Sequence, residues 1–316
     1  MNWKVKAALL KGFDALPGGA RTYRYLQSHL GRISDKPEGR LPMFSEMAQW
    51  LIDAGRPIAG ATYFEVGTGH LPTVPVCLSL LGAQQVITVD LYPRLDYRAF
   101  AGLLNRLAAD RVAYERQLAV FAPPPEILKE RFELLARFKD RPREFMERAG
   151  IVYLAPCDAA NTGLAAATVD CHLSVTVFEH VPQDVIAGIM REAKRILKDT
   201  GLAIHFIDPS DHFQHQDPSI GRSNFLRYSE KEWHRIAGNQ FAYTNRLRRS
   251  DLVRLFEDAG FDILRQFNGV DPAGIPDDFP LDASFSGYDR EDLCTITVRL
   301  LAAKRSGSGA GSATAT

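Results

Sequence analysis

The stretch "YFEVGTGHLPTVPVCLSLLGAQQVITVD", residues 63–90, decides the fold. An apolar run leads into Gly67 and Gly69, a helix-like segment follows, and a second apolar run ends at Asp90. This order is typical of a nucleotide-binding βαβ unit, whose glycines form a tight turn beneath the ligand. Asp90 follows the turn by roughly 20 residues, where an acid commonly accepts the hydroxyl groups of a ribose. A carboxylate there suits a ribose without a phosphate.

The same stretch argues against a second interpretation, in which the chain is a nicotinamide-dependent oxidoreductase. The NAD fingerprint has a third glycine three residues after the second, where helix and strand pack closely. Pro72 occupies that position. The oxidoreductase therefore stays an alternative that this motif disfavours.

The rest of the chain predicts a doubly wound, mostly parallel sheet with seven strands. Helix-like patterns at residues 72–81, 183–198 and 250–259 separate several of the apolar runs, as in an α/β fold. No helix pattern lies in residues 268–292, so the last strand is free to enter antiparallel. The runs of strand length, rich in β-branched residues, are 62–66, 85–90, 151–155, 169–177, 202–208, 261–267 and 294–302.

Two connections are longer than the few residues that usually join such elements. Residues 91–150 predict two or three helices around "FAPPPEIL", and residues 209–249 form a second insert. Both leave the carboxyl ends of strands, where ligands bind in open α/β sheets. We therefore expect both to form helical caps over one domain at residues 61–305, preceded by a helical segment at 1–60 and followed by a disordered tail at 306–316.

The composition narrows the class of partner and the compartment. The 316 residues include 38 basic and 38 acidic side chains, so no overall positive field favours a nucleic acid. No run approaches the roughly 18 apolar residues of a membrane span. Four cysteines without a CxxC pair predict reduced core residues of a cytoplasmic protein. They are Cys77, Cys157, Cys171 and Cys294. The composition is also compatible with a homodimer.

Five segments in order resemble the class I S-adenosylmethionine-dependent methyltransferases. "FEVGTGHLP" is similar to the glycine-loop motif, "VITVD" to the segment with the ribose-binding acid, and "APCDAAN" to the adenine contact. "VDCHLSVTVFEHVP" and "EAKRILKDTGLAIHF" are similar to the fourth-strand motif and the helix, turn and strand after it. The architecture of residues 207–248 loosely resembles methyltransferases of bacterial polysaccharide gene clusters. The resemblance implies a Rossmann-like methyltransferase fold, S-adenosylmethionine as cofactor and a small-molecule or glycan acceptor.

The resemblance also implies roles for single residues. Glu65 would order the glycine loop and face the methionine end, while Gly67 and Gly69 would pass beneath the cofactor. Asp90 would bind both ribose hydroxyls. The two remaining implied contacts are an adenine contact at Asp158 and a methyl-transfer site lined by Phe178 or its neighbours.

Methyl transfer to a hydroxyl benefits from a general base, and "IDPSDHFQHQD" after the fifth strand offers one. His212 is the first candidate, with Asp211 as its orienting carboxylate. His180 in "FEHVP" is a second candidate, although a structural hydrogen bond explains it too. No metal site is expected, because the spacing matches no closed metal motif. The open alternatives are an ordinary polar loop and a divalent metal held by Asp208, Asp211, His212, His215 and Asp217.

The second insert alternates aromatic and basic side chains. Aromatic faces can hold a sugar ring, and arginines can grip a phosphate or carboxylate. Packing around the small helix "SEKEWHRIAG" explains the same aromatics, and a non-catalytic cofactor-binding scaffold stays open as a further alternative. The residues are Phe225, Arg227, Tyr228, Trp233, His234, Phe241, Tyr243, Arg246, Arg248 and Arg249.

Overall fold

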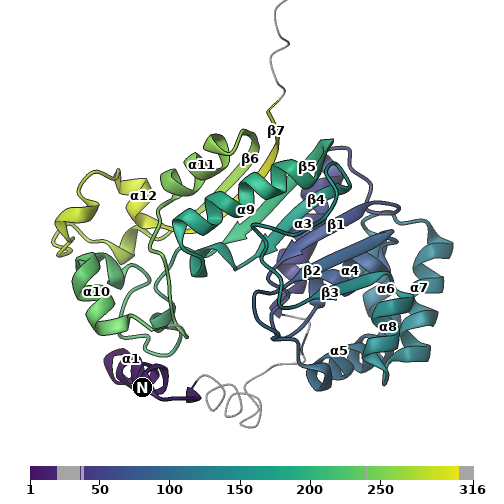
Figure 1. The fold of residues 1–316 in the computed structure, drawn as a ribbon, viewed down its shortest axis with the longest axis horizontal. Coiled ribbons are helices and arrows are strands. Elements are labelled where there is room, and N and C mark those ends of the chain that lie inside the picture. Colours follow the sequence, from purple (N-terminus) through teal and green to yellow (C-terminus); the bar gives the residue numbers. More distant parts are fainter. Residues whose placement is uncertain (20–35, 37–38, 240, 306–316) are drawn as a thin grey trace, which may run out of the picture.

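The computed structural model describes residues 1–19, 36, 39–239 and 241–305. At its centre lies a seven-stranded sheet in the order β3-β2-β1-β4-β5-β7-β6 (Figure 1). β1 to β5 pair in parallel, whereas β7 pairs antiparallel with both β5 and β6. The doubly wound, mostly parallel sheet and its antiparallel last strand are thus confirmed. The strands are β1 (Thr62–Val66), β2 (Gln85–Val89), β3 (Ile151–Leu154), β4 (Val169–Val175), β5 (Leu197–Ile207), β6 (Phe261–Val270) and β7 (Thr295–Lys304).

Helices cover both faces of the sheet, because successive side chains of a strand point to opposite sides. Tyr63 packs with α3 (Leu41–Asp53) and α4 (Thr73–Leu80) in one buried cluster. Its neighbour Phe64 packs in the other, with α9 (Gln183–Ile196) and α11 (Arg249–Asp258). The result is a three-layer α/β/α arrangement with one hydrophobic cluster on each face of the sheet.

Helix α9 ends at Ile196, two residues before its predicted end. Leu197 is already paired in parallel with Val169 of β4, so hydrogen bonding to the sheet takes over at once. Gly201 is of the residue type that commonly ends a helix, yet it lies inside β5. The helix buries one apolar face, formed by Ile186, Ile189, Met190 and Ala193.

The first insert forms four helices, and its main body is not the predicted cap. α7 contacts α4, and α8 leads into the amino end of β3, so these helices lie along the flank of the sheet (Figure 1). Phe100, Phe132 and Phe145 are buried there in the same cluster as α4. Burial of this large apolar surface holds the helices away from the carboxyl edge. They are α5 (Tyr97–Ala109), α6 (Arg111–Ala119), α7 (Pro125–Phe138) and α8 (Pro142–Arg148).

The second insert starts at the carboxyl end of β5, as predicted, and the N-terminal helix joins it. The insert contains η3 (His212–His215), η4 (Asn224–Arg227) and α10 (Glu230–Ala237). α1 (Trp3–Ala15) contacts α10, and in Figure 1 α10 stands between α1 and α12 (Arg290–Cys294). The Trp3 ring stacks on Trp233 with centroids 5.8 Å apart, and its backbone N–H donates to Asp217 at 2.8 Å. The two described helices of the predicted N-terminal segment therefore pack in different places, α1 with the second insert and α3 against the sheet.

The cysteines, the membrane-span prediction and the C-terminal tail can be compared with the described residues. All four cysteines are free, and three of them are buried. Within the described ranges, no helix combines the length and apolar character needed to cross a membrane. The predicted disordered tail at residues 306–316 lies outside the described residues.

Candidate active site

The turn after β1 contains two glycines in the left-handed region. Gly67 has φ = 83°, and a Cβ atom on it would lie 2.5 Å from Cγ2 of Val177. Gly69 has φ = 67°, also in the left-handed region that favours glycine. Its backbone N–H donates to both carboxylate oxygens of Asp90, at 3.3 and 3.2 Å. The turn thus brings the backbone beside the acid that ends β2, as the sequence predicted.

Asp90 is a buried carboxylate held in one orientation. The Tyr153 hydroxyl donates to Oδ2 of Asp90 at 3.0 Å and accepts from the Arg94 backbone N–H at 3.0 Å. Burial raises the pKa of Asp90 to about 6, so it is mostly ionised at neutral pH. An ionised carboxylate has further lone pairs that can accept ribose hydroxyls. Sequence reasoning missed Tyr153, because only the pairing of β3 with β2 brings it here.

Glu65, at the end of β1, is connected to the glycine turn by hydroxyl groups. Thr88 donates to Oε2 of Glu65 at 2.5 Å, and its Oγ1 lies 2.5 Å from that of Thr68. Burial raises the pKa of Glu65 to about 8, against the lowering effect of the Thr88 hydrogen bond. This chain of contacts supports the implied role of Glu65 in ordering the turn.

The positively charged side chain of Arg40, in the loop before α3, lies at this end of the sheet. Arg40 donates to the Thr176 hydroxyl at 2.6 Å and to the Val175 carbonyl oxygen at 3.3 Å. Its positive charge lowers the pKa of Glu65, although less than burial raises it. Sequence reasoning missed Arg40, because nothing local to it indicates contact with a strand more than 100 residues away.

Asp158 and Phe178 differ in how well they fit their implied roles. Asp158 is exposed, and the backbone N–H of Cys157 beside it donates to the Asp90 carbonyl oxygen at 2.9 Å. An adenine next to the ribose can therefore reach Asp158. Phe178 is fully buried and stacks on His205 with centroids 4.5 Å apart. Its ring belongs to the core, so of the predicted lining by Phe178 or its neighbours only the neighbours, Glu179 and His180, stay candidates.

The residues at this edge fit S-adenosylmethionine. At Gly69 a Cβ atom would meet no other atom within 4 Å, so the turn presents bare backbone to open space there, and the buried Asp90 offers an acceptor for a ribose. Glu65 and the turn would hold the methionine end, and Asp158 the adenine. These positions share one edge of the sheet, at the carboxyl ends of β1, β2 and β3.

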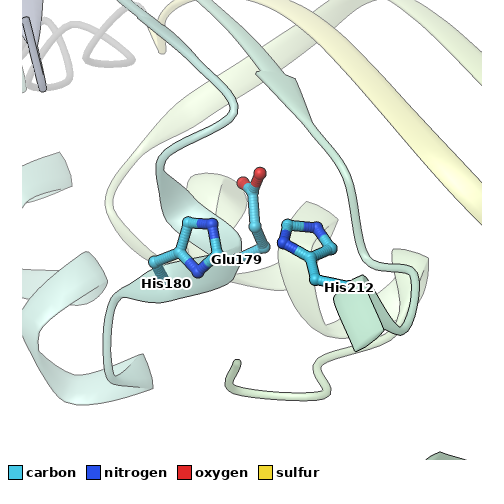
Figure 2. Close-up of side chains that lie close together, drawn as sticks. All are labelled: Glu179, His180 and His212. Atoms are coloured by element: carbon cyan, nitrogen blue, oxygen red, sulfur yellow. The ribbon is translucent and has the colours of Figure 1, made fainter. Parts of the chain in front are cut away.

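A second group of polar side chains stands at the carboxyl ends of β4 and β5. Glu179 and His180 lie in η2 (Phe178–His180), and His212 begins η3. One donor atom from each lies within 4.8 Å of the others, and Figure 2 shows the two imidazole rings on either side of the Glu179 side chain. We call these three residues the Glu179 cluster. Two histidines predicted from separate motifs are thus brought together.

Glu179 is the member that sequence reasoning missed. Its side chain is 2% exposed, and within the described residues neither carboxylate oxygen completes a hydrogen bond. Burial raises its pKa to about 8, while the nearby backbone N–H groups of Glu179 and Asp208 lower it by less. The motif "FEH" carried a signal, because a carboxylate directly before a candidate histidine at a strand end can face the same site.

Both histidines keep a neutral ring. His180 Nδ1 lies 2.8 Å from the Tyr243 carbonyl oxygen, which fixes the proton on Nδ1. Burial lowers the pKa of His180, and burial together with His180 lowers that of His212 to about 4. Nε2 of His212 lies 3.6 Å from Oδ2 of Asp208. Each ring can therefore offer a nitrogen lone pair.

Asp208, and not Asp211, is the carboxylate beside His212. The two oxygens of Asp211 accept from the Phe213 backbone N–H at 2.9 Å and from Asn224 Nδ2 at 3.0 Å. Asp211 therefore caps η3 from a buried position, and its predicted role as the orienter of His212 is wrong. Adjacency in the chain therefore did not identify the carboxylate that lies beside His212.

Four of the ten aromatic and basic residues of the second insert are buried, and three are exposed. The buried ones are Phe225, Trp233, Arg246 and Arg248. Phe225 and Trp233 are buried in the cluster that also contains Trp3. Arg246 donates to the Phe225 and Tyr228 carbonyl oxygens, at 3.1 and 2.7 Å. The packing interpretation is therefore correct for these residues, and they do not form an open platform for a sugar.

Removal of the Asp90 carboxylate tests the cofactor site. We expect Asp90→Ala to weaken S-adenosylhomocysteine binding by about 1 to 3 kcal/mol, the range for polar groups left without a partner. Isothermal titration calorimetry measures this change. Asp96→Ala is the matched control, since Asp96 caps α5 nearby through Arg98 and Ala99. Equal affinities of Asp90→Ala and the parent would remove Asp90 from the cofactor site.

Comparison with known proteins adds a family match. The pattern of a family described as a methyltransferase domain matches residues 40–266. The comparison with curated proteins found no match.

Solved structures give distant similarities. Magnesium protoporphyrin IX methyltransferase from Synechocystis PCC 6803, with bound SAH, shares 14% identity at a TM-score of 0.46, over 96% of this chain and 100% of that one. A putative sarcosine dimethylglycine methyltransferase from Galdieria sulphuraria shares 13% identity at 0.46, over 85% and 87%. Geranyl diphosphate C-methyltransferase from Streptomyces coelicolor A3(2) shares 12% identity at 0.43, over 82% and 80%.

Proposed function

We propose that this chain, which belongs to the S-adenosylmethionine-dependent methyltransferase family, transfers the methyl group to an oxygen of a hydroxylated small molecule or glycan. The observation that carries this proposal is the Glu179 cluster beside the cofactor turn. Val177 touches Gly67 of that turn, and the cluster begins two residues later. An acceptor next to the turn would therefore meet these side chains.

The chain holds the cofactor and the acceptor with different residues. When bound, S-adenosylmethionine supplies a methyl group on a positively charged sulfur, which departs with the bonding electron pair. Glu65, Gly67, Gly69 and Asp90 would bind and orient the cofactor. Asp158 would contact its adenine.

The Glu179 cluster suits an acceptor that must lose a proton. A neutral hydroxyl is a poor nucleophile, whereas a neutral amine already carries a reactive lone pair. We propose that the hydroxyl proton passes to the lone pair of His212 as the oxygen forms its new bond to carbon. Tyr243 fixes the orientation of His180 on the opposite side. Both rings would then contact the acceptor.

Incubation of the full chain with isotopically labelled S-adenosylmethionine tests this proposal. The acceptors are matched pairs, each a hydroxylated small molecule or oligosaccharide and its amino counterpart. We expect the label on oxygen, identified by mass spectrometry and by the NMR shift of the new methyl group. Preferential labelling of the amines or of carbon would overturn oxygen as the acceptor while leaving the family unchanged.

A further inference from the structure

We infer that the Glu179 cluster binds one divalent transition-metal cation. The inference deepens the proposed function, on which its catalytic consequence rests, but binding itself does not depend on the acceptor. Glu179, His180 and His212 each offer a donor atom, and these atoms lie within 4.8 Å of one another. Ligands about 2.1 Å from a common ion lie about 3 to 4 Å apart, so a small inward movement closes the site.

The unpartnered atoms indicate a ligand that the chain itself does not supply. Both oxygens of Glu179 are buried without a hydrogen bond in the described part of the chain, as is Nε2 of His212. A buried polar atom without a hydrogen-bond partner costs about 1 to 3 kcal/mol, and such atoms are rarely left so. Bound to a cation, all three would be satisfied at once.

The surrounding residues hold the donors in the orientation that metal ligation needs. The Nδ1–H group of His180 donates to the Tyr243 carbonyl oxygen, which leaves Nε2 with its lone pair. This is the usual arrangement of a ligating histidine, whose second nitrogen donates to a carbonyl or carboxylate. Asn245 fixes the backbone of the same turn: its side chain donates to the Phe178 and Val181 carbonyl oxygens at 2.6 and 2.7 Å. Its backbone N–H donates to the Glu179 carbonyl oxygen at 2.9 Å.

The donor set selects the class of cation. Two imidazoles and one carboxylate suit Zn²⁺, Fe²⁺, Mn²⁺ or Co²⁺, whereas Mg²⁺ and Ca²⁺ prefer an all-oxygen shell. Three protein ligands leave coordination positions open. An acceptor hydroxyl at such a position becomes more acidic and releases its proton to water. With the cation present, His212 acts on the hydroxyl as a ligand of the cation instead of accepting its proton.

Titration of the full chain with Co²⁺ tests the site without any acceptor. The protein is first freed of metals by dialysis against a chelator, and binding is followed by the visible absorption of the cobalt complex. We expect one Co²⁺ per chain for the parent, displaced by Zn²⁺ but not by an equal concentration of Mg²⁺. Glu179→Gln and His212→Ala should each weaken Co²⁺ binding by about 10-fold to 100-fold or more.

Two controls separate loss of the site from loss of the fold. His215→Ala removes an exposed histidine whose ring centroid is 5.2 Å from that of His212, and it should bind Co²⁺ like the parent. S-adenosylhomocysteine binding should be unchanged in all three variants if they fold. The inference is overturned if the parent binds no stoichiometric Co²⁺, or if folded Glu179→Gln and His212→Ala bind it as the parent does. Labelled methyl on oxygen in a metal-free, fully active protein would reject the cation and keep the proposed function.

Discussion

His212→Ala is expected to lower the turnover number for methyl transfer by about 10²-fold to 10⁴-fold, the usual contribution of a group that assists proton removal. Nε2 of His212 faces Oδ2 of Asp208 at 3.6 Å, and its ring lies 4.8 Å from that of His180, centroid to centroid. The loss is expected whether the nitrogen takes the proton directly or holds the proposed cation. Steady-state assays with a saturating labelled donor measure it.

Cofactor affinity distinguishes this effect from general damage. S-adenosylhomocysteine should bind His212→Ala as tightly as it binds the parent, because His212 is absent from the hydrogen bonds that shape the glycine turn. His215→Ala should retain nearly full turnover and serves as the matched control. Near-normal turnover of His212→Ala would remove it from the chemistry and leave proximity alone, or His180, as the explanation.

Arg248→Ala is expected to lower the free energy of unfolding by about 3 to 5 kcal/mol, as for a large buried side chain whose removal leaves a cavity and unpaired partners. Arg248 is 1% exposed and donates to the carbonyl oxygens of Pro209 and Arg246, at 2.7 and 3.2 Å, and of Thr295 at 3.4 Å. Burial lowers its pKa to about 10, so it stays charged at neutral pH. It joins the start of the second insert to the start of β7.

Chemical denaturation measures this change in stability. Arg141→Ala is the control, since its ion pair with Glu144 has both side chains about half exposed, and such pairs contribute less than about 1 kcal/mol. Equal losses in the two variants would mean that the internal bonds of Arg248 do not anchor the insert.

The central sheet could be predicted from the sequence because its signals are local. Each strand is a short apolar run, and the glycine turn at Gly67 is followed at the usual spacing by Asp90. The family match over residues 40–266 confirms the predicted family and S-adenosylmethionine as the cofactor. It sets aside the oxidoreductase and the scaffold as alternatives.

The sequence failed where placement depends on tertiary contacts. The pattern of an amphipathic helix predicts that one face is buried, but it does not identify the element against which that face packs. The main body of the first insert was therefore wrongly predicted to lie over the carboxyl edge of the sheet. Asp211 stands next to His212 in the chain, yet its side chain turns to Asn224. Glu179 was overlooked because an isolated glutamate is usually exposed, and only the structure shows it buried near His180 and His212.

A crystal structure of the full chain with S-adenosylhomocysteine tests the central claim most directly. The account predicts the ribose hydroxyls on Asp90, the adenine at Asp158, and the sulfur above Gly67 with its open side toward His180 and His212. A methyl group on that sulfur would then point at the Glu179 cluster. Binding with the ribose away from Asp90, or with the sulfur facing away from the carboxyl ends of β4 and β5, would contradict the account.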